Sequence, residues 1–176
     1  MDQFFKLGST FTMNLFSYGI IALIAGITLF SFLTKKNKRP KFVSFFLCAL
    51  IFFMIWLLII VPSNAGITIE NDELKINIPL SAEITVARKD VASCKVVDWN
   101  QDTDYKPLLR TFGTSLGDYR IGNFKLKNGK SAKLLAIGEK AVVIELKNEN
   151  YLLVLAPKDF DGFVKVINEN FVKVIN

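Results

Sequence analysis

The chain has 176 residues, of which 51% are hydrophobic, and it carries a net charge of +6 without any histidine. This composition is too apolar for an average soluble domain, so membrane spans are the first expectation. The lack of histidine removes the commonest general base and the commonest side-chain metal ligand. The two cysteines predict no disulfide framework, because Cys48 lies in a stretch expected inside the bilayer and Cys94 does not.

Two long uncharged stretches lie in the N-terminal part of the chain. Each contains a run of roughly 20 apolar residues, the length that crosses about 30 Å of hydrocarbon as a helix. We therefore expect spans at residues 12–33 and 42–61, with Pro62 ending the second. The end of the first span lacks a small-residue cleavage site, which argues against a removable signal peptide. Residues 1–62 are thus predicted to form a transmembrane helical hairpin.

The seven residues between the spans hold most of the excess charge. Five of them are basic: Lys35, Lys36, Lys38, Arg39 and Lys41. The chain after residue 62 has 16 basic and 15 acidic residues, which gives no support for nucleic-acid binding. The positive-inside rule predicts a multi-pass plasma-membrane protein with this segment in the cytoplasm and both termini outside it. The alternative role of such a segment is contact with nucleic acid or anionic lipid headgroups.

Small residues indicate how the spans would pack. Gly19, Ala22 and Gly26 fall near one side of the first span, and Ser44 and Cys48 form a small strip on the second. Helices in lipid associate through close packing at such residues. We expect them to form the seam of the hairpin, with a homo-oligomer interface as the alternative. Neither span carries a charge, so an ion or proton pathway is not expected.

The rest of the chain is predicted to be mainly β, with about seven strands. Short alternating runs bounded by turn residues lie at 67–69, 74–78, 83–87, 93–97, 119–126, 132–137, 141–146 and 151–156. Asn-Asp at 71–72 and Asn-Gly at 128–129 are turn signals, because these residue types tolerate positive φ. Residues 157–174 then place apolar side chains at spacings of three and four, which predicts an amphipathic helix.

One stretch makes the fold more specific. Residues 110–130 contain a glycine-punctuated segment, then a Gly-x-Phe strand at Phe124 and an Asn-Gly turn. With the later apolar strand, Pro157 and the closing helix, this pattern resembles membrane-anchored bacterial PH-like (pleckstrin-homology-like) domains over residues 66–172. The resemblance implies a β-barrel closed by a C-terminal helix, here residues 63–176, and it supplies no catalytic residue. The basic cluster with which eukaryotic PH domains bind phosphoinositides is not visible.

The segment 110–122 is the first candidate for contact with a partner or ligand. Its members are Arg110, Gly113, Gly117 and Arg120. Successive backbone N–H groups in such a segment can cradle an anion. The alternative is that the glycines only supply turn geometry and a bulge. Trp99 joins the candidates because its amphipathic ring suits a binding surface or the membrane interface.

No constellation in the chain predicts catalysis. Asp98, Asp102 and Asp104 cluster near Trp99, but the spacing of a calcium-binding EF-hand is absent, so a solvated loop is expected. There is no Ser–His arrangement, no metal-ligand spacing and no recognisable pair of carboxylates. We therefore expect no enzyme activity, metal or cofactor.

The predicted function is a non-enzymatic, membrane-anchored binding or scaffold module. Its β domain would present an edge strand or loop at the extracytoplasmic face to another membrane or envelope protein. The alternative is an accessory subunit of a membrane enzyme or transporter complex.

Overall fold

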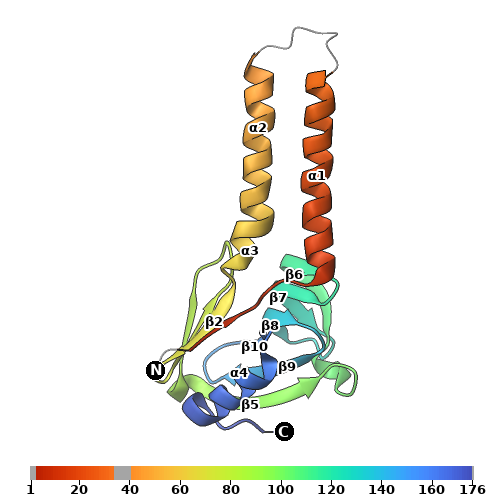
Figure 1. Ribbon diagram of the computed structural model, residues 1–176. Coiled ribbons are helices and arrows are strands. Elements are labelled where there is room, and N and C mark those ends of the chain that lie inside the picture. Colours follow the sequence, from red (N-terminus) through yellow and green to blue (C-terminus); the bar gives the residue numbers. More distant parts are fainter. Residues whose placement is uncertain (1–2, 34–40, 176) are drawn as a thin grey trace.

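The computed structural model describes residues 3–33 and 41–175, with two long helices standing on a mainly β domain (Figure 1). The predicted topology signal falls largely outside this description. The structure does not describe Lys35, Lys36, Lys38 and Arg39. It describes the backbone of Lys41 but not its side chain.

Two helices are long and apolar enough to cross a membrane. The first is α1 (Phe11–Leu33). The second helix consists of α2 (Lys41–Ile55), one π-helical stretch η1 (Trp56–Ile60) and the short α3 (Val61–Ser63). The helix ends at Ser63, one residue after the Pro62 at which it was expected to stop. The proline lies in the last turn of the second helix, directly after the π-helical stretch η1.

The small residues of the two helices do not form a seam. A Cβ built on Gly19 or Gly26 would meet no atom within 4 Å, and Cys48 is exposed. The predicted seam of Gly19, Ala22 and Gly26 against Cys48 is therefore wrong, and the side chain of Ser44 lies outside the description. A different side of α1 is buried, through Met13, Ser17 and Thr28. Their spacing of four and then eleven residues places them on one helical face.

A first sheet, which we call sheet A, ties the two helices together at the domain. Its order is β1 (Gln3–Lys6), β2 (Gly66–Glu70), β3 (Glu73–Asn77) and β4 (Ile84–Ala87), with antiparallel neighbours. Strand β1 precedes α1, β2 follows α3, and Lys6 lies opposite Gly66. The predicted turn between β2 and β3 is confirmed, because Asn71 and Asp72 both have positive φ.

The second sheet, sheet B, has six strands in the order β5-β9-β10-β8-β7-β6. Their bounds are β5 Val91–Asp98, β6 Pro107–Leu116, β7 Tyr119–Leu126, β8 Ser131–Ile137, β9 Lys140–Leu146 and β10 Tyr151–Ala156. Strand β10 is antiparallel to β9 and parallel to β8, so it lies inserted between two strands that are consecutive in sequence. Two 3₁₀ turns flank β5, η2 (Arg88–Asp90) before it and η3 (Thr103–Tyr105) after it.

Apolar side chains cover both faces of sheet B. One face packs with sheet A and the C-terminal helix, through residues that include Leu7, Leu74, Phe163 and Phe171. The other face holds a second cluster that includes Trp99, Phe124, Leu134 and Val143. The C-terminal helix is confirmed but shorter than predicted, as α4 (Phe160–Val166) and the π-helical η4 (Ile167–Phe171). The described residues form ten strands in two sheets, and not one closed barrel of about seven.

Candidate functional site

Strand β6 forms one edge of sheet B and lies largely in solvent. It pairs with β7 on one side, and among the described residues no strand pairs with its other side. All of its residues except the two at its ends are exposed, including Leu108 at 72% and Phe112 at 59%. The opposite edge of the sheet is partly covered, because Ile175 exchanges backbone hydrogen bonds with β5. Strand β6 is therefore the long open edge of the domain.

Residues 110–122 thus form most of the hairpin β6–β7. Gly113 of β6 lies directly opposite Gly122 of β7, with φ of 103° and 115°. A Cβ on Gly113 would overlap the Ile121 carbonyl oxygen and lie 2.8 Å from the Gly122 Cα. Gly117, with φ 58°, lies in the turn. These glycines allow two backbones to approach closely and then reverse direction.

The two arginines of this hairpin have different surroundings. Arg110 lies on β6, is exposed and makes no ion pair among the described residues. The Arg120 guanidinium donates through Nη1 to the carbonyl oxygens of Gly138, at 3.1 Å, and Asp118, at 3.3 Å. It also lies over the Trp99 ring, 5.1 Å from the centroid. Arg110 therefore stays exposed on β6, whereas Arg120 stabilises its own domain.

Trp99 is not a surface residue. Its side chain is 1% exposed and belongs to the second core cluster. The expectation that this ring contacts a partner or the membrane interface is therefore wrong, because the ring is already covered by the side chains of the core. Its indole Nε1–H is buried without a hydrogen-bond partner in the structure.

The acidic segment beside Trp99 is tied to neighbouring groups. Asp98 accepts a hydrogen bond from the Asn100 backbone N–H at 2.9 Å, and Asp102 lies 3.7 Å from the Lys95 ammonium. Across the part of the chain that the structure describes, no group of three or more His, Cys, Asp or Glu side chains could hold a metal ion.

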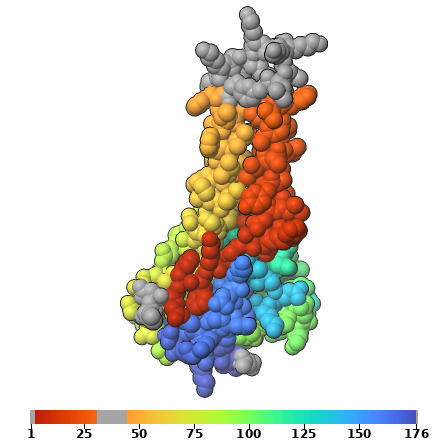
Figure 2. Space-filling model, viewed as in Figure 1, coloured from red at the N-terminus to blue at the C-terminus, as the bar shows by residue number. Residues whose placement is uncertain are grey.

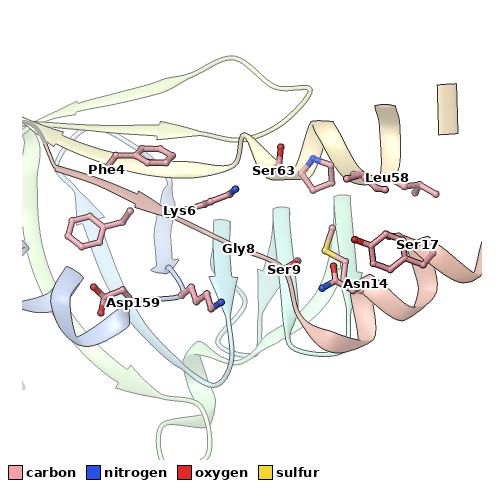
Figure 3. Close-up of a pocket in the computed structure, with 15 residues that line it drawn as sticks. Phe4, Lys6, Gly8, Ser9, Asn14, Ser17, Leu58, Ser63 and Asp159 are labelled. Atoms are coloured by element: carbon pink, nitrogen blue, oxygen red, sulfur yellow. The ribbon is translucent and has the colours of Figure 1, made fainter. Parts of the chain in front are cut away.

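A second candidate region lies where the helices meet the domain, and the sequence did not predict it. A cavity of about 800 Å³, which we call the junction cavity, is lined by β1, the start of α1, the end of the second helix and Lys158 (Figure 3). A smaller, mostly apolar cavity of about 370 Å³ lies between the same helices and β6. The two cavities share Met13, Ser17, Leu58 and Pro62. The segments that line the junction cavity lie far apart in sequence. Predicting the cavity would have required strand β1, which the sequence analysis did not identify.

A family model for the bacterial PH domain matches residues 65–170. The chain belongs to the bacterial PH-domain family. No curated protein and no solved structure matches it significantly. The match extends from the residue before β2 into η4 and leaves out β1 and both long helices. The match confirms the PH-domain part of the resemblance inferred from the glycine-punctuated segment, and the membrane anchoring stays a prediction. PH domains are generally non-enzymatic binding modules, and no catalytic family is indicated.

Burial and surface ion pairs shift the pKa values of several groups in this PH domain. Burial raises the pKa of the Cys94 thiol to about 12 and that of the Tyr119 hydroxyl to about 12, so both stay protonated at neutral pH. A protonated, buried thiol is a poor nucleophile. The Lys130 ammonium, 2.8 Å from Glu145, lowers the pKa of that carboxyl. Both side chains of this pair are about half exposed, which is typical of a surface ion pair.

Proposed function

We propose that this chain is a membrane-anchored PH domain that binds an extended segment of another membrane or envelope protein along β6. The open edge of β6 carries the proposal. An unpaired edge offers a row of backbone donors and acceptors to which a further strand can add. Exposed Leu108, Leu109 and Phe112 on that edge supply apolar surface for the side chains of the added strand.

The two long helices support the anchoring. They project away from the domain as a narrow pair (Figures 1 and 2). In the apolar window of the second helix no residue is buried, and large side chains such as Leu23, Phe45 and Phe52 are exposed. A core helix of a soluble protein would bury these side chains. Hydrocarbon of the bilayer removes them from water instead.

Strand β6 reaches the level at which the helices leave the domain. Phe112 and Gly113 line the smaller cavity together with Phe16 of α1 and Leu57 of η1. Leu80, in the loop after β3, lines the same cavity and is 69% exposed with φ 62°. A left-handed conformation is costly for leucine. The exposed Leu80 side chain fits an apolar contact with the membrane surface. A partner that binds β6 at this level would therefore itself be a membrane protein.

The basic segment between the helices favours an extracytoplasmic domain. We test this with one cysteine at the exposed Asp104, in a chain whose Cys48 and Cys94 are replaced by alanine. Intact cells are treated with a membrane-impermeant maleimide. Labelling without lysis supports the proposed side, whereas labelling only after lysis places the domain in the cytoplasm and makes cytosolic partners the candidates.

Partner binding is tested with a photo-cross-linking amino acid at Leu109 in living cells. We expect one heterologous adduct, and we expect Leu108→Lys with Phe112→Lys to abolish it, because both side chains are exposed and the fold tolerates the change. The control carries the cross-linker at the exposed Glu169 of η4 and should give no such adduct. An adduct of twice the chain mass would identify a homodimer and overturn the proposal, as would an adduct unaffected by the two lysines.

A further inference from the structure

The junction cavity combines an apolar wall with basic side chains. Met13, Leu58 and Ile59 of the helices line its membrane side, and Lys6 of β1 and Lys158 line its domain side. Figure 3 shows Lys6 extending from β1 toward Ser63 at the end of the second helix. The basic groups therefore lie where the apolar helices end, which is the depth of lipid headgroups when the helices span the bilayer.

A backbone hydrogen bond joins Lys158 to Lys6. The Lys158 N–H donates to the Lys6 carbonyl oxygen at 3.3 Å. The methylene groups of Lys158 pass over Gly8, where a built Cβ would lie 3.2 Å from Lys158 Cδ. Gly8 has φ 82°, so a side chain there would be strained and would also displace Lys158.

Neither ammonium group has an anionic partner among the described residues. The acidic residue that lines the cavity is Asp159, whose carboxylate accepts a hydrogen bond from the Gly162 N–H as the cap of α4. The titratable lining groups are thus two lysines, one capping aspartate and Tyr18, which leaves a net positive charge. Such a site favours an anion.

We propose that the junction cavity binds an anionic phospholipid of the adjoining leaflet. Lys6 and Lys158 contact its phosphate, and one acyl chain lies between α1 and the second helix, along Ser17 and Leu58. The smaller apolar cavity shares these two residues and gives the chain room to continue. A soluble anion would leave the apolar wall of Met13, Leu58 and Ile59 uncovered. The inference rests on the proposed membrane anchoring but applies to whichever leaflet adjoins the domain.

The test uses the full chain in phosphatidylcholine bilayers containing a trace of spin-labelled phosphatidylglycerol or spin-labelled phosphatidylcholine. Electron spin resonance then reports the fraction of each label that the protein restricts in motion. We expect phosphatidylglycerol to be favoured, and Lys6→Gln with Lys158→Gln to lower this preference about tenfold, since each lysine near a headgroup contributes about a fivefold effect before screening. The control, Lys165→Gln with Lys173→Gln, removes the same charge from exposed positions outside the cavity and should keep the preference.

A second variant tests the acyl chain. Ser17→Phe fills the space between the helices and should lower the restricted phosphatidylglycerol without changing the restricted phosphatidylcholine. The proposal is overturned if the wild type restricts both lipids equally, or if millimolar glycerol phosphate removes the preference, because the site would then take a soluble anion. Extraction by alkaline carbonate separates the two proposals. Release of the chain refutes the anchoring itself, whereas a chain that stays in the membrane without lipid preference refutes only this site.

Discussion

Replacing Gly113 by alanine should destabilise the β6–β7 hairpin far more than a typical surface substitution does. Gly113 has φ 103°, a conformation that residues with a side chain rarely adopt, and it lies directly opposite Gly122. The new methyl group would overlap the Ile121 carbonyl oxygen of the partner strand. Because this obstacle is backbone, it cannot move aside without opening the hairpin.

The magnitude follows from two contributions. Holding a non-glycine residue in such a conformation costs about 1–3 kcal/mol. Forcing an extra carbon against packed neighbours costs about 1–3 kcal/mol more. The free energy of unfolding should therefore fall by about 2–6 kcal/mol, a large part of the roughly 5–15 kcal/mol that a domain has.

The assay is urea unfolding of the full chain in detergent micelles, followed by the emission of the buried Trp99 in a Trp56→Phe background. The matched control is Gly129→Ala, since Gly129 has φ 82° but no atom within 4 Å of a built Cβ. It should lose only the backbone contribution, about 1–2 kcal/mol. Equal losses in the two variants would show that the close approach at Gly113 does not exist, and would refute our account of the hairpin.

Three further outcomes are expected from the packing and the protonation states. Arg120→Met should lower the free energy of unfolding by about 1–3 kcal/mol, measured by urea unfolding, because the Gly138 carbonyl loses its donor. Cys94, in a chain without the other cysteine, should not react with Ellman's reagent at pH 8 until urea unfolds the domain, because burial keeps its thiol protonated; rapid reaction of the native protein would contradict this. Phe5→Ala should cost about 1–3 kcal/mol in thermal unfolding, because its ring packs edge-on against Phe163 with centroids 5.3 Å apart; an unchanged midpoint would place β1 outside the cooperative fold.

The elements that were predicted correctly carry their signal locally. The eight runs proposed as strands correspond to β2–β5 and β7–β10, because each is a short run, alternating or continuously apolar, bounded by turn residues. The two helices were visible from the length of their apolar stretches. The family resemblance rested on glycines at positions whose backbone conformation other residues rarely adopt. Gly113 and Gly122, both with positive φ, are examples.

The elements that were missed depend on tertiary contacts. Strand β6 is exposed on both faces and has two bulges in its pairing with β7, so its side chains show no alternation. Strand β1 has four residues, and its partner β2 lies some sixty positions later, so nothing local distinguishes it from the approach to a helix. Trp99 was misplaced because an amphipathic ring suits both a surface and a core, and only the packing under Arg120 decides between them. The junction cavity could not be predicted from the sequence either, because it forms only when β1 pairs with β2.

The pairing of β1 with β2 also determines how the domain can present its open edge. Four residues, 7–10, connect β1 to α1, and two, 64–65, connect α3 to β2. The Leu7 N–H donates to the Ala65 carbonyl oxygen at 3.0 Å, so the two connections are themselves joined (Figure 1). The helices also meet the domain at a second place, where the turn at Gly117 between β6 and β7 lies close to Thr12 at the start of α1. A domain on flexible linkers would lose orientational freedom when it bound a partner, and that loss would weaken binding. Here the orientation of β6 relative to the helices is set during folding, which suits the proposed binding of a membrane protein along β6.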